Sequence, residues 1–276
     1  MLEQLMELFQ YPFITRALIV GTLVSLCAAL LGVSLVLKRY SMIGDGLSHV
    51  GFGALACAQV AGVAPLTLAI PIVVAAAILL LRLSESGKIK GDAAIAFIST
   101  GALAAGVLII SLSRGANTDL LNYMFGSILA MSTGDVVLSI CLSLAVLVLY
   151  LFFYNKIFAV TFDETFAKAT GKKTSLYNTV IAALTAVTIV LGMRMMGALL
   201  ISALVIFPAL SAMRMFKSFA GVTVCSVILS VICFFIGILA SYFYAAPTGA
   251  SVVMVHMAAF LLFSVAGAVL NRFSPR

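Results

Sequence analysis

Long apolar stretches that are nearly free of charge constrain the fold of this chain more than any other feature. The stretches 17–37, 93–112, 136–153 and 222–243 each approach or exceed the roughly 20 residues that an α-helix needs to cross the hydrocarbon core of a bilayer. Hydrophobic residues make up 64% of the chain and charged residues only 9%. A soluble fold of this size could not cover so much apolar surface with so few charges, because soluble domains carry about 25% charged residues. The sequence therefore predicts an all-α polytopic membrane protein.

Polar breaks divide the chain into about nine predicted membrane-spanning helices, which together are expected to form one transmembrane domain over residues 1–276. The predicted helices cover residues 15–37, 45–63, 65–82, 92–112, 134–153, 175–193, 196–213, 218–243 and 249–270. Segment 117–131 is apolar but short, and it is predicted to be re-entrant. Residues 1–13 lack the positive region of a signal peptide and are predicted to form a short helix in the membrane interface.

The basic residues of the predicted loops indicate which side of the membrane faces the cytoplasm. One side receives Lys38, Arg39, Arg82, Lys88, Lys90, Lys156, Lys168, Lys172, Lys173, Arg214, Lys217, Arg272 and Arg276, and the other receives Arg16, Arg114 and Arg194. Because cytoplasmic loops are enriched in Lys and Arg, the C-terminus is predicted inside and the N-terminus outside. A span at 117–131 would remove this bias, which supports the re-entrant assignment.

Several function classes are excluded by what the sequence lacks. The net charge of +7 comes from residues that anchor helices at the membrane, and no predicted loop is long enough for a nucleic-acid-binding domain. No G-x-x-x-x-G-K-[ST] sequence is present, so any ATP-driven work requires a partner subunit. There is no HExxH sequence, no paired Asp motif and no nucleophile beside a base, so no enzymatic activity is expected. The five cysteines form no CxxC pair and are expected to be small buried hydrophobic residues.

Asp45 and His49 stand out among the polar residues, because they lie four residues apart where the second predicted span begins. On a helix, both side chains project from one face. Three interpretations stay open: a helix cap with a structural histidine, a proton relay, and a metal site. An imidazole and a carboxylate suit Zn(II), Mn(II) or Fe(II) better than Cu(I). Two copies of the chain would supply two such pairs around a central path.

Two further regions carry candidate residues. His256 is alone in the last predicted span, where a hydrogen-bonded structural role is the simpler interpretation, with a place on the ion path as the alternative. The cytoplasmic loop 162–174 is predicted to contain a short helix with acidic residues at its start and a glycine at its end. Its candidate residues for docking a motor subunit are Asp163, Glu164, Ala167 and Gly171; an ordinary solvated turn is the alternative.

Four segments of the chain resemble the permeases of zinc, manganese and iron ABC importers. They are MIGDGLSHVGFGALA, DLLNYMFGSILAMSTGD, FDETFAKATG, and MGALLISALVIFPALSAMRM running on to APTGASVVMV. They occur in the family's order over nearly the whole chain. The combination of G-D-x-[LI]-[SA]-H with G-x-L-[LI]-[IV]-x-x-L-[LIV]-x-x-P-A is fairly specific. The chain departs from many members in having Gly51-Phe52-Gly53 where they carry Leu-Pro-Gly.

The resemblance implies an ABC importer permease of the metal or cobalamin type in the plasma (inner) membrane of a prokaryote. Its implied partners are a second copy of itself, two cytoplasmic ATPase subunits that bind ATP, and an extracytoplasmic metal-binding protein. By residue match, Asp45 and His49 fall on the metal path, and Asp163 to Gly171 fall on the coupling helix that fits into the ATPase. No permanently bound cofactor is expected. The cargo is a divalent metal, zinc first and manganese next.

Two other transporter classes remain as alternatives. A gradient-driven secondary transporter would use Asp45 as its proton or cation site and would work without partners. A siderophore or cobalamin permease of related architecture would have a wider pathway, and Asp45 and His49 would be dispensable in it.

Overall fold

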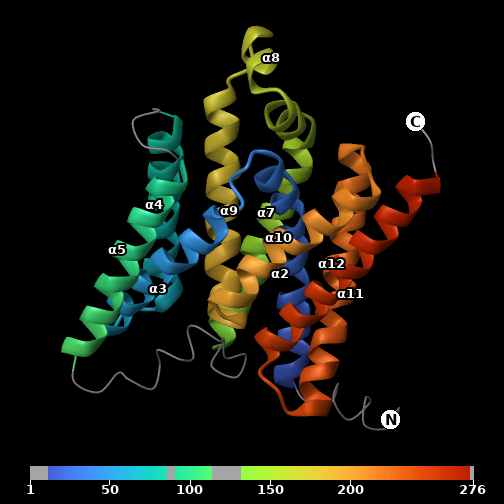
Figure 1. Ribbon diagram of the computed structural model, residues 1–276. Helices are drawn as coiled ribbons and strands as arrows, with labels where there is room; N and C mark the ends of the chain where they lie inside the picture. The colour runs from blue at the N-terminus through green and yellow to red at the C-terminus, as the bar shows by residue number, and fades with distance from the viewer. Residues whose placement is uncertain (1–11, 86–90, 114–131, 274–276) are drawn as a thin grey trace.

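The computed structural model describes residues 12–85, 91–113 and 132–273, and every regular element in these ranges is an α-helix (Figure 1). The helices are α2 (Pro12–Leu37), α3 (Ile43–Ala61), α4 (Pro65–Glu85), α5 (Gly91–Leu112), α7 (Thr133–Phe162), α8 (Glu164–Ala169), α9 (Thr174–Met196), α10 (Ala198–Met215), α11 (Phe219–Tyr244) and α12 (Thr248–Phe273). Residues 1–11 of the predicted interfacial helix and the predicted re-entrant segment 117–131 lie outside the described residues. The all-α prediction is confirmed.

Nine of the described helices correspond one to one with the nine predicted spans. Eight of them are long and apolar enough to cross a membrane. The ninth, α3, does not meet that standard, because Asp45, Ser48, His49 and Gln59 lower the hydropathy of a helix of 19 residues. Most of its residues are buried against α4, α5, α9 and α10, so α3 is solvated by protein rather than by lipid.

Two predicted boundaries were wrong. The fifth span was predicted to end at residue 153, but α7 continues to Phe162 and so includes Asn155 and Lys156. These polar side chains do not break a helix that extends past the hydrocarbon core, because water satisfies them there. The sixth and seventh spans meet at Gly197, whose φ of 87° ends α9 and lets α10 begin one residue later.

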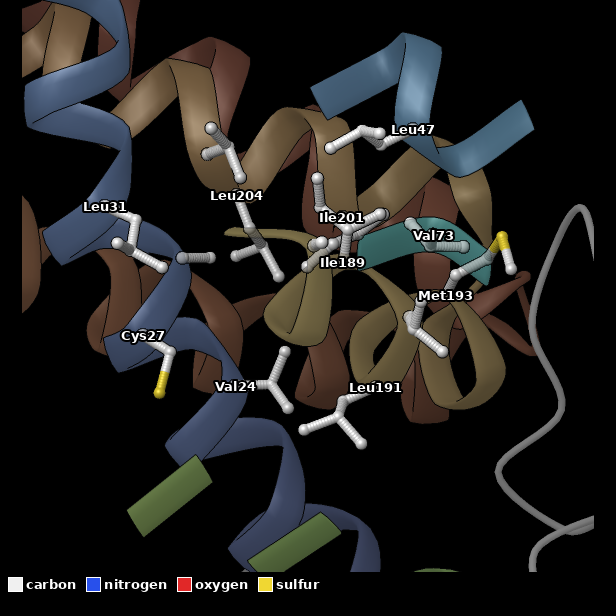
Figure 2. Packing of buried hydrophobic residues seen from close by; sticks show 14 of the residues in the cluster. Val24, Cys27, Leu31, Leu47, Val73, Ile189, Leu191, Met193, Ile201 and Leu204 are labelled. Carbon is white, nitrogen blue, oxygen red and sulfur yellow. The ribbon is translucent and has the colours of Figure 1, made fainter. Parts of the chain in front are cut away.

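The bundle has a central layer of α2, α7, α9 and α10, with α3, α4 and α5 on one side and α11 and α12 on the other (Figure 1). Apolar side chains of α2, α9 and α10 fill the middle, including Val24, Ile189, Ile201 and Leu204 (Figure 2). Met193, Met195 and Met196 are also buried, as expected for core methionines. Apolar packing therefore holds α2, α9 and α10 together at the centre of the bundle.

The short helix α8 lies at one end of the bundle, together with the end of α2 and the C-terminal end of α12 (Figure 1). At the opposite end, Arg194 Nη2 of α9 lies 4.0 Å from Asp135 Oδ2 of α7, and both side chains are largely buried. Asp135 also closes a capping box with Ser132 at the start of α7. The end of α9 is thus joined to the start of α7 by polar contacts.

Candidate metal site and coupling segment

Asp45 lies in the first turn of α3, where the positive end of the helix dipole stabilises a carboxylate. The N-cap of this helix is Met42, and its side chain makes no capping hydrogen bond. Asp45 Oδ1 instead accepts a long hydrogen bond of 3.5 Å from the Ser202 hydroxyl of α10. Asp45 is therefore not the N-cap, and its carboxylate faces side chains rather than backbone amides.

His49 lies one turn beyond Asp45, and the two side chains meet as the four-residue spacing predicts. His49 Nε2 is 3.6 Å from Asp45 Oδ2, which is longer than a hydrogen bond. Two ligand atoms on one tetrahedral zinc ion are separated by about 3.3 Å, because zinc–ligand bonds measure about 2.0–2.1 Å. The oxygen and nitrogen are thus close to the spacing that a shared ion requires, without being locked to each other.

A cavity of 310 Å³ opens beside this pair between α3 and α5. Asp45, His49, Asp92 and Ser99 are among the residues that line it. The side chains of Asp45 and His49 are 44% and 27% exposed, so both can be reached by a hydrated ion. Within the described ranges, no three His, Cys, Asp or Glu side chains lie close enough together to hold a metal ion. The described residues therefore place one carboxylate beside one imidazole, with a second carboxylate farther away on the cavity wall.

Asp92 is the cavity residue that sequence reasoning missed, because it was grouped with the acids at span ends. It stands in the first turn of α5, just as Asp45 stands in the first turn of α3. Helices α3 and α5 are separated by one antiparallel span, so they run in the same direction and their first turns lie at the same level. The order of the spans was enough to predict that Asp45 and Asp92 lie at the same level. It was not enough to predict that α3 packs directly on α5.

Glycines bring the helices around the cavity close together. A Cβ at Gly46 would lie 2.6 Å from Ile95 Cγ2, and one at Gly53 would lie 2.7 Å from the Ala102 carbonyl oxygen. A Cβ at Gly51 would lie 2.7 Å from Met193 Cε of α9. The small residues around the Asp45–His49 pair are therefore needed for the close approach of α3 to α5 and α9.

His256 is not brought to this cavity. It lies on α12, which packs against α10 and α11 on the other side of the bundle (Figure 1). Its side chain is buried, and its Nδ1 lies 2.9 Å from the Val252 carbonyl oxygen one turn earlier. The residues lining the cavity come from α3 and α5 and the residue just before α3, so the structure separates His256 from the Asp45–His49 pair.

The predicted short helix in the loop after α7 is confirmed as α8. Asp163 is its N-cap and accepts a hydrogen bond of 2.8 Å from the Phe166 amide. Gly171 follows the helix with a φ of 78°, a conformation that favours glycine. Ala167 is fully buried, whereas Phe162 and Phe166 are 75% and 63% exposed. Two large aromatic side chains are therefore exposed among the polar residues of this segment, and the sequence analysis did not single them out.

Glu164 is turned toward the bundle. Its Oε2 accepts a hydrogen bond of 2.9 Å from Lys38 Nζ at the end of α2, and its Oε1 accepts one of 2.9 Å from Asn178 Nδ2 of α9. Lys38 Nζ also donates to Asn178 Oδ1, which closes a triangle of three side chains. Of the four predicted docking residues, Asp163 caps α8, Glu164 contacts α2 and α9, and Ala167 is buried.

Comparison with known proteins gives a consistent assignment over almost the whole chain. A model of the ABC 3 transport family matches residues 10–267. The "Manganese transport system membrane protein MntC" of Halalkalibacterium halodurans is 28% identical over 97% of this chain and 92% of its own length. The "High-affinity zinc uptake system membrane protein ZnuB" of Haemophilus influenzae is 29% identical over 91% of this chain and 97% of its own length.

A solved structure shares the fold. "PsaBC from Streptococcus pneumoniae in complex with Fab" aligns with a TM-score of 0.85 and 28% sequence identity, covering 95% of each chain. The family model, the relatives and the fold agree, and this chain is a member of the ABC 3 transport family.

Proposed function

We propose that this chain is the membrane permease of an ATP-driven importer of divalent metal ions, and that the ion passes Asp45 and His49. The observation that carries the proposal is the pairing of a carboxylate and an imidazole 3.6 Å apart beside a cavity, on a polar helix buried within a membrane bundle. Intramembrane ionisable residues are costly, and they commonly mark an ion path.

The ion's ligands are incomplete within one chain. Asp45 and His49 give two ligands, whereas zinc takes four in a closed site and keeps an open position in a labile one. A second copy of the chain would supply a second pair. A site that never closes fully around its ion also suits a transporter, which must release what it binds.

The proposed cargo is zinc first and manganese next. A neutral imidazole with a carboxylate suits zinc, and the carboxylate oxygen of Asp45 is also a ligand type that manganese accepts. The names of the relatives include both a manganese system and a zinc system, which supports a divalent metal without choosing between the two.

ATP would be hydrolysed by separate cytoplasmic subunits that grip α8. The exposed Phe162 and Phe166 give the end of the bundle an apolar surface next to the capped helix, which is suited to a protein groove. The same end carries most of the basic residues counted above, so α8 and the C-terminus would face the cytoplasm. A metal-binding protein would deliver the ion at the opposite, outer end.

The test is uptake of radioactive zinc and manganese by cells that express the permease with its ATPase and binding protein. Asp45→Ala and His49→Ala are each expected to abolish uptake at normal membrane abundance, whereas His256→Asn, which removes the other histidine, is expected to retain it. Normal uptake in the first two variants would contradict the ion path. Uptake by the permease alone would instead favour the gradient-driven alternative.

A further inference from the structure

Three side chains from distant parts of the sequence form a closed hydrogen-bonded triangle under α8. They are Lys38 at the end of α2, Glu164 at the start of α8, and Asn178 in the second turn of α9. The side chain of Lys38 is only 9% exposed, and Asn178 is buried. The Glu164 side chain is 46% exposed, so the network is buried on the Lys38 and Asn178 side and open to water on the Glu164 side. Its charge-assisted hydrogen bonds and shared partners make it stronger than an isolated exposed ion pair. It ties α8 firmly to the end of α2.

The turn that follows Lys38 is a compact, fully hydrogen-bonded structure. Arg39 adopts a φ of 62°, which is uncommon for a residue other than glycine. The Tyr40 amide donates to the Leu35 carbonyl at 2.8 Å, and the Arg39 amide donates to the Val36 carbonyl at 3.1 Å. This is the hydrogen-bond pattern of a Schellman motif, which satisfies carbonyl groups of the last helical turn. The turn therefore moves as one piece with Lys38.

The chain continues from this turn into α3 with no flexible linker. The Ile43 amide donates to the Tyr40 carbonyl at 3.0 Å, and the Gly46 amide donates to the Met42 carbonyl at 3.0 Å. Asp45 is only seven residues beyond Lys38. A displacement of the Lys38 end of the turn is thus carried directly into the first turn of α3.

A second side chain of the same turn connects it to the helices beyond the cavity. The Tyr40 hydroxyl lies 3.1 Å from the Ser84 hydroxyl near the end of α4, and a Cβ at Gly91 would lie 3.0 Å from Ser84 Oγ. Asp92, which lines the cavity, follows Gly91. The turn 38–42 therefore contacts α8 and α9 through Lys38 and the end of α4 through Tyr40, and Ser84 of α4 lies next to the start of α5.

We propose that Lys38 is a positioning residue that couples α8 to the metal-facing helix: the Lys38–Glu164–Asn178 triangle passes movement of α8 through the turn 38–42 to Asp45. Lys38 contacts neither the ion nor the ATPase. This inference rests on the proposed function, because it takes α8 as the element that the ATPase moves. It gives Glu164 an internal role in place of direct docking.

The test uses the whole transporter, with permease, ATPase and metal-binding protein reconstituted in liposomes. Zinc uptake and ATP hydrolysis are measured together, and the readout is zinc transported per ATP hydrolysed. Lys38→Met keeps the length of the side chain and removes the charge. Lys217→Met is the matched control, since Lys217 is an exposed lysine in the loop between α10 and α11 at the same end.

The Lys38→Met transporter is expected to bind its ATPase and hydrolyse ATP near the wild-type rate, while zinc per ATP falls by about fivefold or more, the range of typical coupling between sites. Glu164→Gln is expected to produce the same loss. The double variant is expected to be no worse than either single variant, because both break one link. Lys38→Arg, which retains the charge, is expected to restore most of the ratio.

An unchanged ratio in Lys38→Met would overturn the inference, as would an equal loss in Lys217→Met. Loss of ATPase binding in Lys38→Met would also overturn it, since Lys38 would then act in docking. If Lys38→Met fails to insert in the membrane, zinc transported per ATP is compared between Glu164→Gln and Lys38→Arg. A loss in Glu164→Gln but not in Lys38→Arg supports the inference, and an unchanged ratio in Glu164→Gln overturns it. Failure of the wild-type transporter to take up zinc or manganese with ATP would instead contradict the proposed function itself, without involving any variant.

Discussion

The α3–α5 cavity and the α8 segment are both polar regions of a very apolar protein, but they are built in opposite ways. Around the cavity, Asp45 is held by contacts of 3.5 Å and 3.6 Å to Ser202 and His49. Under α8, Glu164 accepts two hydrogen bonds of 2.9 Å from Lys38 and Asn178. The first region leaves its polar atoms available, and the second saturates them.

This difference matches two different physical tasks. A site that must take up and release an ion needs ligands that are near one another but not committed to one another. A link that must pass on movement needs short, cooperative contacts that resist local opening. In this chain, the proposed ion path therefore has long polar contacts, whereas the proposed coupling path has short ones.

The largest effect is expected where the loose pair is removed. Asp45→Asn keeps the size of the side chain but removes the charge that faces both the cavity and His49. Loss of a metal ligand in a site with so few ligands is expected to lower zinc uptake by about 100-fold, consistent with the large cost of incomplete coordination. Uptake per permease in the membrane is the measurement. Uptake within twofold of wild type would contradict the assignment of Asp45 to the ion path.

A large effect on stability is expected where α3 meets α5. Gly53→Ala places a Cβ 2.7 Å from the Ala102 carbonyl oxygen, which belongs to backbone and cannot turn away. The expected cost is about 1–3 kcal/mol of folding free energy, measured by thermal unfolding in detergent. Gly101→Ala is the matched control on the same helix pair, because no atom lies within 4 Å of its Cβ position. Equal unfolding temperatures in both variants would contradict the close packing.

A smaller effect is expected at Asp92. This carboxylate lines the cavity but is not grouped with Asp45 and His49 closely enough to hold a metal with them. Asp92→Asn therefore removes only a water-screened charge near the path, worth about 1 kcal/mol or roughly fivefold in apparent affinity at a dielectric close to that of water. The zinc concentration at half-maximal uptake is expected to rise by that factor while the maximal rate holds. A loss as large as that of Asp45→Asn would show that Asp92 is a direct ligand.

The smallest effect is expected at the cap of α8. Asp163→Asn preserves an oxygen that can accept from the Phe166 amide, whereas Asp163→Ala does not. Loss of the cap costs about 1 kcal/mol of local helix stability. Zinc uptake is expected to fall severalfold in Asp163→Ala and to stay near wild type in Asp163→Asn. Equal losses in both would show that the negative charge, rather than the cap, is what the ATPase requires.

Much of the fold could be predicted because lipid imposes a simple rule on sequence. Long apolar stretches found nine helices, and the four-residue spacing placed Asp45 beside His49. The extension of α7 to Phe162 was missed, since a helix that leaves the bilayer is no longer marked by hydropathy. The short helix with acidic residues at its start was predicted from local sequence, and the structure adds that Asp163 is its N-cap.

The contacts between residues far apart in the sequence depend on which helices are neighbours, and helix neighbours could not be predicted from one sequence. Lys38 and Glu164 are 126 residues apart, and nothing in either local sequence indicates the other. Asp92 was overlooked for the same reason, since its importance comes only from the packing of α5 on α3. Glu164 was predicted to face a partner because it is charged and lies in a loop; its side chain is 46% exposed, and the sequence did not indicate that its carboxylate also contacts Lys38 and Asn178.

Zinc transport by the reconstituted His49→Ala complex tests the central claim most directly. ATP hydrolysis and zinc entry into liposomes are followed together, with wild type beside it. The His49 side chain pairs with Asp45 of its own helix, and it is not a member of the Lys38–Glu164–Asn178 triangle, so its removal leaves that triangle in place. ATP is therefore expected to be hydrolysed still, while zinc no longer enters. Zinc entry at the wild-type rate would contradict an ion path past Asp45 and His49.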